Sequence, residues 1–118
     1  MSPILARRIA AIFGFLAVAI GAFGAHGLKP LLEQNGTTGI WQKAVIYHLG
    51  HAVALLALAL QPKVPKVPFS AFATGILVFS GSLYLLAATN DHWLGAITPI
   101  GGISFLIGWA CLGLSSGK

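Results

Sequence analysis

The stretch AVIYHLGHAVALLALALQP, residues 44–62, carries no formal charge over 19 residues. About 20 apolar residues cross the hydrocarbon core of a bilayer as an α-helix, so this stretch predicts a transmembrane helix. Three other uncharged stretches accompany it, 20, 24 and 26 residues long: 9–28, 67–90 and 92–117. The sequence therefore predicts an all-α membrane protein, a bundle of four transmembrane helices.

The composition agrees with this class. Charged residues make up 8% of the chain and hydrophobic residues 57%, with a mean hydropathy of +0.88. A soluble domain has about 25% charged residues. Four spans leave almost no residues for a second domain. We therefore expect a single transmembrane domain over 1–118, with these approximate spans: 8–27, 41–60, 68–89 and 93–114.

The basic residues predict the orientation of the chain. The net charge is +5, but the basic residues stand singly or in pairs at the ends of apolar stretches, which indicates membrane topology and not nucleic-acid binding. Four spans place these basic residues on the side of both termini: Arg7, Arg8, Lys63, Lys66 and Lys118. Lys29 and Lys43 fall on the other side, with the acids Glu33 and Asp91. By the positive-inside rule, both termini are expected in the cytoplasm, with the chain in a bacterial inner (plasma) membrane.

The polar side chains within the spans are expected to share one depth. Counting about 1.5 Å per residue from Trp41, taken as an interfacial anchor, His48 lies roughly 10 Å inside the membrane and His51 roughly 15 Å. The same count from the ends of the later spans gives comparable depths for their polar residues, while the inner half, such as AVALLALAL at 52–60, is apolar. The sequence therefore predicts an outward-facing polar site, lined by His26, His48, His51, Ser80, Tyr84 and Thr98.

Two interpretations of His48 and His51 stay open. Spaced i and i+3, they project from one side of a helix, and ionisable residues in a membrane usually face a bundle interior or a cavity. Neutral imidazoles could fasten helices by hydrogen bonds to Tyr84, Ser80, Ser82 or backbone carbonyls. Alternatively, they could contact a small ligand, handle protons, or join His26 in holding haem or a metal ion. Apart from that alternative, the sequence indicates no cofactor.

The sequence contains no recognisable arrangement of catalytic residues. Both acids, Glu33 and Asp91, lie in connections between spans, so the membrane holds no carboxylate pair. The chain shows no nucleophile with a positioned base and no His-Glu motif. We therefore expect a non-enzymatic membrane protein.

Small residues and prolines predict how the helices pack and end. Rows of small residues at four-residue spacing predict close helix contact, within one copy or between copies of a homo-oligomer: Ala10 and Gly14; Ala17, Gly21 and Ala25; Ala71 and Gly75. In KPLLEQNG, residues 29–36, Pro30 suits the first turn of a short helix and Gly36 its C-terminal cap. Pro99 predicts that the last helix either begins at Thr98 or is kinked there.

Four ordered motifs carry a resemblance over nearly the whole chain. They are GAFGAHGL at 21–28, W-x5-YH-x2-HA at 41–52, GILVFSGSLYLL at 75–86 and GAITPIGG at 95–102. With these motifs the chain resembles the small membrane proteins of domain-of-unknown-function family four-two-three, a bacterial family with eukaryotic relatives. The resemblance implies a four-span inner-membrane protein. It implies no activity and no catalytic residues.

Overall fold

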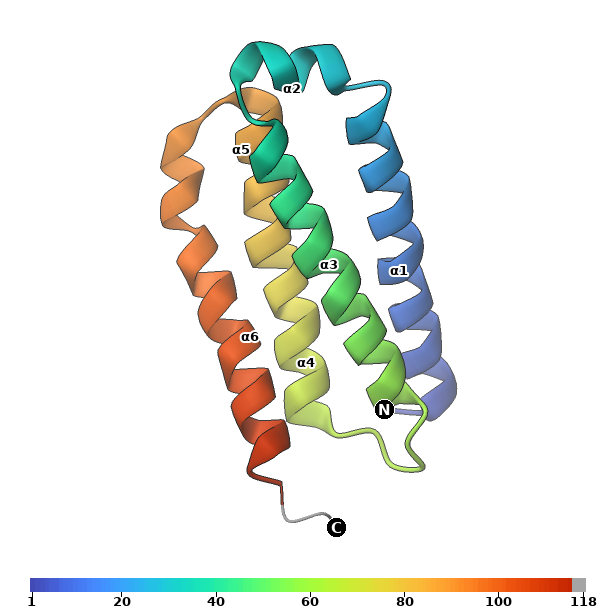
Figure 1. The fold of residues 1–118 in the computed structure, drawn as a ribbon. Coiled ribbons are helices and arrows are strands. Elements are labelled where there is room, and N and C mark those ends of the chain that lie inside the picture. Colours follow the sequence, from blue (N-terminus) through green and yellow to red (C-terminus); the bar gives the residue numbers. More distant parts are fainter. Residues whose placement is uncertain (116–118) are drawn as a thin grey trace.

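The computed structural model describes residues 1–115, which fold into helices joined by short connections (Figure 1). Four helices are long and apolar enough to cross a membrane: Pro3–Ala25, Thr38–Ala59, Lys66–Thr89 and His92–Gly113. The first two are the continuous helices α1 (Pro3–Ala25) and α3 (Thr38–Ala59). The number of spans thus agrees with the four uncharged stretches. Lys118, one of the basic residues assigned to the side of the termini, lies outside the described residues.

The short helix α2 (Lys29–Asn35) connects the first two spans, as its proline and the glycine after it predict. Pro30 lies in its first turn, where a missing N–H is harmless. Gly36 follows its last residue with φ of 69°, a left-handed conformation that suits glycine. The helix therefore begins and ends where the sequence indicates.

The third span is not one regular α-helix. It consists of α4 (Lys66–Gly75), a π-helical segment η1 (Ile76–Ser80) and α5 (Gly81–Thr89). Ser80 is fully buried, and its Oγ donates to the carbonyl of Ala44 in α3 at 2.8 Å. This contact fixes the end of the π-helical segment to the neighbouring span.

The fourth span begins with a 3-10 helix, η2 (His92–Ala96), and continues as α6 (Thr98–Gly113). Pro99 lies in the first turn of α6 and not in the interior of a kinked helix. Of the two predicted alternatives, the structure therefore has the helix beginning at Thr98. The 3-10 turn supplies the remaining length of the span.

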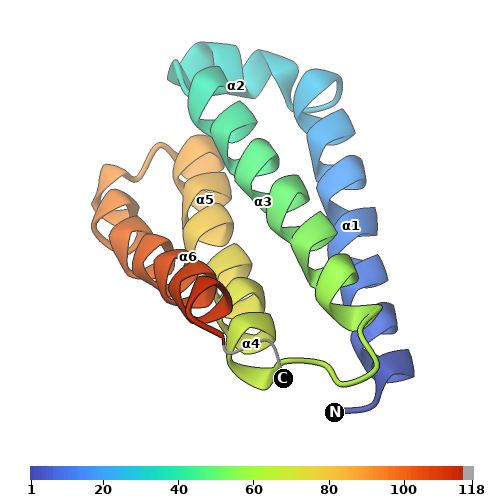
Figure 2. The same cartoon turned by 60° about the horizontal axis from the view of Figure 1, so that its bottom comes forward.

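The spans are arranged with α3 and the third span in the middle. Helix α1 packs on α3, and α6 packs on α4 and η1, so α1 and α6 flank the central pair on opposite sides (Figures 1 and 2). The molecule measures 50 × 25 × 17 Å along its principal axes. The N-terminus, the 60s connection and the end of α6 lie at one end, and α2 lies at the other (Figure 1).

Three glycines let α6 and the third span approach closely. A Cβ at Gly101 would lie 2.3 Å from the backbone nitrogen of Phe79. A Cβ at Gly75 would lie 2.3 Å from the ring of Phe105, and one at Gly108 would lie 2.5 Å from the ring of Phe72. Close contact between these helices therefore depends on having glycine, which has no side chain, at these three positions. This is expected of small residues at helix interfaces in membranes.

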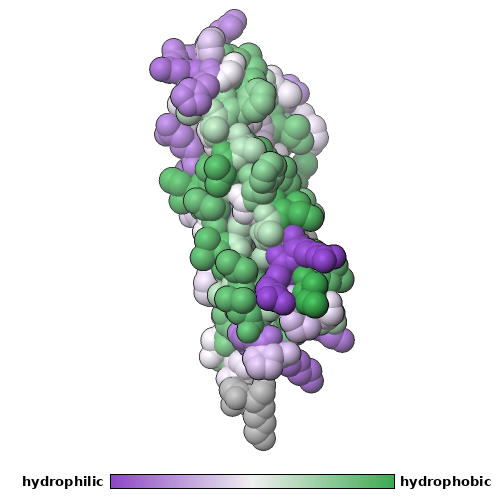
Figure 3. All heavy atoms as spheres, turned by 90° about the vertical axis from the view of Figure 1, so that its right-hand side faces the viewer, coloured by the Kyte–Doolittle hydropathy of each residue, from purple (hydrophilic) through white to green (hydrophobic). Residues whose placement is uncertain are grey.

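The face of the molecule that carries α1 is mostly apolar (Figure 3). Its hydrophilic side chains gather at the two ends, and one hydrophilic group interrupts the apolar surface in the lower half. Arg7 and Arg8 are exposed on α1, about 6 to 8 Å from its first residue. Helix α1 therefore extends beyond the predicted start of the span at residue 8, and long Arg side chains at this depth can reach the head-group region.

Candidate functional site

Polar side chains within the spans mostly bond to a neighbouring helix. Each pair of packed spans has at least one such bond: Trp41 to Ile20, His48 to Tyr84, Ser80 to Ala44, Ser82 to Thr98, and Ser104 to Ala71. In hydrocarbon, an unpaired polar group is costly, so each bond favours the observed helix arrangement. This pattern matches the helix-fastening interpretation of the polar residues.

His48 and Tyr84 meet at the centre of the molecule. His48 is 3% exposed, and its Nδ1 lies 2.8 Å from the hydroxyl of Tyr84. The other ring nitrogen, Nε2, is buried without a hydrogen-bond partner among the described residues. The ring of Phe13 in α1 lies edge-on to the imidazole, with ring centroids 6.2 Å apart. His48 thus links α3 to α5 and also contacts α1.

His51 has different surroundings. Its Nδ1–H donates to the carbonyl of Tyr47 at 2.8 Å, which leaves Nε2 to accept from the indole N–H of Trp109 at 3.0 Å. The imidazole also stacks on Phe105, with ring centroids 3.7 Å apart and planes 11° apart. Both nitrogens are therefore satisfied in a neutral ring, and His51 belongs to an aromatic contact between α3 and α6.

The remaining predicted site residues lie in three places, and Ser80 bonds to Ala44, one helical turn before His48 in α3. Thr98 shares a hydrogen bond of 2.6 Å with Ser82, which joins α6 to α5. His26 is exposed in the turn after α1, beyond the end of the span. The structure thus brings His48 together with Tyr84 but places His26, His51 and Thr98 in other surroundings.

The described residues contain no group of three or more His, Cys, Asp or Glu side chains that could together hold a metal ion. His92, the fourth histidine, bonds to Asn90 at 2.8 Å in the connection before η2. Each histidine therefore has its own neighbours, and no two of them share a hydrogen-bond partner within residues 1–115.

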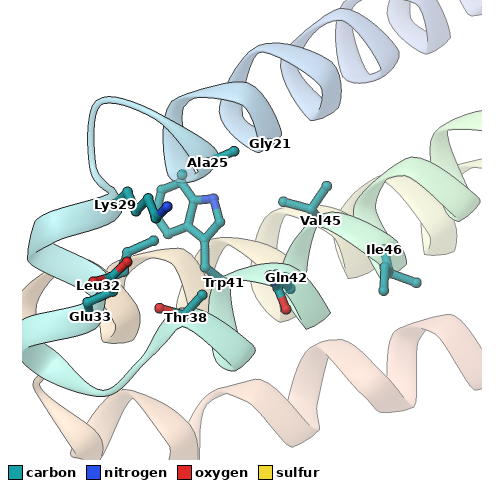
Figure 4. A pocket seen from close by; sticks show the side chains of 11 residues that line it. Gly21, Ala25, Lys29, Leu32, Glu33, Thr38, Trp41, Gln42, Val45 and Ile46 are labelled. Atoms are coloured by element: carbon teal, nitrogen blue, oxygen red, sulfur yellow. The ribbon is translucent and has the colours of Figure 1, made fainter.

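A groove of about 500 Å³ lies between α1, α2 and α3, at the end of the molecule away from the termini (Figure 4). Its two charged side chains, Lys29 and Glu33, lie on α2, and two polar side chains, Thr38 and Gln42, lie along α3. Gly21, Val45 and Ile46 continue it along the two spans. The groove therefore has its charged side chains at the end of the spans and is mostly apolar along them.

Trp41 forms the wall between the two parts of the groove (Figure 4). It is 7% exposed, and its indole N–H donates to the carbonyl of Ile20 in α1 at 3.1 Å. A Cβ at Gly24 would lie only 2.1 Å from the indole nitrogen, so this glycine makes room for the ring. Trp41, taken from the sequence as an interfacial anchor, thus points inward and joins α3 to α1.

The groove was not predicted from the sequence, because Lys29 was interpreted only as an indicator of topology. A signal was available in the spacing of α2, where Lys29 and Glu33 stand four residues apart and so share one side. Asn35 and Thr37 were missed as well. Their side chains donate to the carbonyl of Ala87 at 3.1 and 2.7 Å and fasten the α2 region to α5.

Comparisons with known proteins agree with the family resemblance that the four motifs carry. The family described as "Protein of unknown function (DUF423)" matches residues 20–102. A UPF0382 membrane protein of Haemophilus influenzae is 43% identical over 114 residues, covering 93% of this chain and 91% of the relative. The UPF0382 membrane protein YwdK of Bacillus subtilis is 40% identical over 116 residues, covering 93% and 94%.

A eukaryotic relative extends the comparison. The UPF0382 membrane protein C1782.12c of Schizosaccharomyces pombe is 35% identical over 112 residues, covering 89% of this chain and 95% of the relative. No solved structure matches the chain. With matches along nearly its whole length, the chain belongs to the DUF423 (UPF0382) family of multi-pass membrane proteins, a family of unknown function.

Proposed function

We propose that the protein is a non-enzymatic membrane protein that binds a membrane lipid in the groove between α1, α2 and α3. One observation carries the proposal: the groove has its charged side chains where the spans end and is mostly apolar along them, which matches a head group followed by an acyl chain. Ligand sites are concave and mostly apolar, with a few polar groups that fix orientation. Trp41 supplies a rigid wall between the two parts.

In this proposal, the histidines and the other polar residues of the predicted site hold the helices together. His48 with Tyr84, Ser80 with Ala44, and Thr98 with Ser82 fasten the spans, and His51 joins α3 to the aromatic residues of α6. These bonds hold α3 fixed while α1 and α2 frame the groove. His26 lies in sequence between Ala25 and Lys29, two residues that line the groove.

The proposed orientation puts both termini in the cytoplasm and the groove at the outer face of a bacterial plasma membrane. Four exposed basic residues support it at the end that carries the termini: Arg7, Arg8, Lys63 and Lys66. Lys29 and Lys43 lie at the other end, near Glu33 and Asp91. The positive-inside rule favours the more basic end as cytoplasmic.

Cysteine labelling in intact cells tests this orientation. With Cys111 replaced by serine, single cysteines at Gln34 and Asp91 should react with a membrane-impermeant thiol reagent, and one at Lys63 should react only after lysis. All three positions are exposed, so a failure to react reports the side of the membrane and not burial of the residue. Reaction at Lys63 alone in intact cells would reverse the orientation.

Filling the groove tests the proposed function. Ile46 lines the groove and is 69% exposed, so Ile46→Trp should fill it without disturbing the helix interface. This variant should retain less lipid per protein after detergent purification, as measured by native mass spectrometry. Val53→Trp is the matched control, because Val53 is 59% exposed on the same helix and lies outside the groove. Equal retention by both variants and the wild type would rule the groove out.

A further inference from the structure

The charged residues of the groove indicate which head group it takes. Lys29 and Glu33 stand on one side of α2 and both line the groove. Both are exposed, and neither makes an ion pair or a side-chain hydrogen bond within residues 1–115. Thr38 and Gln42 add polar groups on α3 (Figure 4). The end of the groove at α2 thus offers one cation and one anion, and within residues 1–115 neither is paired with another side chain.

Resting on the lipid-binding function proposed above, we propose that the groove selects a zwitterionic phospholipid whose head group carries a primary ammonium, as in phosphatidylethanolamine. The phosphate would lie at Lys29, and the ammonium would donate hydrogen bonds to the Glu33 carboxylate, with the acyl chain along Gly21 and Val45. Opposite charges four residues apart on one helix complement the two charges of such a head group. Charge-assisted hydrogen bonds of this kind are stronger than neutral ones.

The alternative head groups fit less well. An anionic head group without an ammonium would meet Lys29 but leave Glu33 unpaired beside a negative charge. A choline head group has no N–H to donate, and proteins recognise it through several aromatic faces. Among the residues that line the groove, Trp41 is the one aromatic side chain described, and it is 7% exposed. The groove therefore has an acceptor for a primary ammonium but not a cage for a quaternary one.

Competition between lipids tests the selection. The full chain would be placed in nanodiscs with equal amounts of phosphatidylethanolamine, phosphatidylcholine and phosphatidylglycerol of identical acyl chains, then extracted and examined by native mass spectrometry. We expect retention of phosphatidylethanolamine to exceed that of each other lipid by about threefold, the size of an exposed charge-pair contribution. Glu33→Gln should abolish the preference over phosphatidylcholine, and Lys29→Gln should lower retention of all three phospholipids, because each carries a phosphate. Lys43→Gln removes an exposed cation at the same end that does not line the groove, and it should leave the preference unchanged.

The outcomes separate this inference from the proposed function. If Ile46→Trp lowers retention but the wild type shows no preference among the three lipids, lipid binding stands and the head-group selection is wrong. If the preference over phosphatidylcholine survives Glu33→Gln, the selection is also wrong. If Ile46→Trp leaves retention of all three lipids unchanged, the groove is not the binding site and both proposals fail.

Discussion

Replacing Gly101 with alanine should destabilise the fold strongly. The added Cβ would lie 2.3 Å from the backbone nitrogen of Phe79 and 2.7 Å from its Cα. A backbone neighbour cannot rotate away as a side chain can, so α6 must move from η1 and lose its contacts with the third span. Overpacking a helix interface in this way costs about 1–3 kcal/mol, and we expect the upper end of that range.

Thermal unfolding in detergent, followed by tryptophan fluorescence, measures the effect. Gly50→Ala is the matched control, because Gly50 is also helical and a Cβ there meets nothing within 4 Å. The control should unfold at or above the wild-type temperature, since alanine favours a helix over glycine. Equal unfolding temperatures for the two variants would show that α6 and η1 do not pack as closely as described.

The second large effect is expected at the centre of the bundle, where Tyr84 bonds to His48. Tyr84→Phe removes the hydroxyl and leaves His48 with two buried ring nitrogens that lack partners. An unsatisfied buried polar group costs about 1–3 kcal/mol. His48→Leu should also destabilise the protein, but the double variant should be more stable than the sum of the two single effects predicts.

A double-mutant cycle measures this coupling from the unfolding free energies of the four proteins. Interhelical hydrogen bonds in membranes give couplings of about 0.6 to 1.7 kcal/mol in such cycles. His48→Asn should be milder than His48→Leu, since it keeps some hydrogen bonding. Strictly additive effects, with bound lipid lost in all variants that fold, would instead assign His48 to the ligand site.

The spans could be predicted from the sequence because membrane insertion depends on the summed hydrophobicity of a stretch, not on its neighbours in space. The ends of α2 and the start of α6 followed from Pro30, Gly36 and Pro99, whose backbone restrictions are local. The π-helical segment at Ile76–Ser80 could not be predicted from any local pattern. Its contacts lie on Ala44 and Gly101, which are far away in the sequence.

Depth could be counted from the sequence, but rotation about the helix axis could not. The count placed His48 and Tyr84 at a similar depth, and their side chains do meet. The same count grouped His51 with them. A shift of three residues leaves the side chain about 60° away around the helix axis, and His51 packs on Phe105 and Trp109 of α6 instead. The small-residue rows likewise predicted close packing without naming the partner helix.

The groove required knowledge of three elements at once. Trp41 lies inward only because Gly24 of α1 leaves room for its ring, and Lys29 and Glu33 reach the groove only because α2 folds back over the end of the spans. No local pattern carries that information. A sequence without an alignment shows the charged residues of α2 but not the wall that they face.

A crystal structure of the protein crystallised from a lipidic mesophase tests lipid binding in the groove most directly. We expect elongated density for an acyl chain between α1 and α3, in contact with Gly21, Val45 and Ile46, with the head group against Lys29 and Glu33. Ordered lipid elsewhere on the surface, together with a groove closed by α2 folding onto Gln42, would contradict the proposed function.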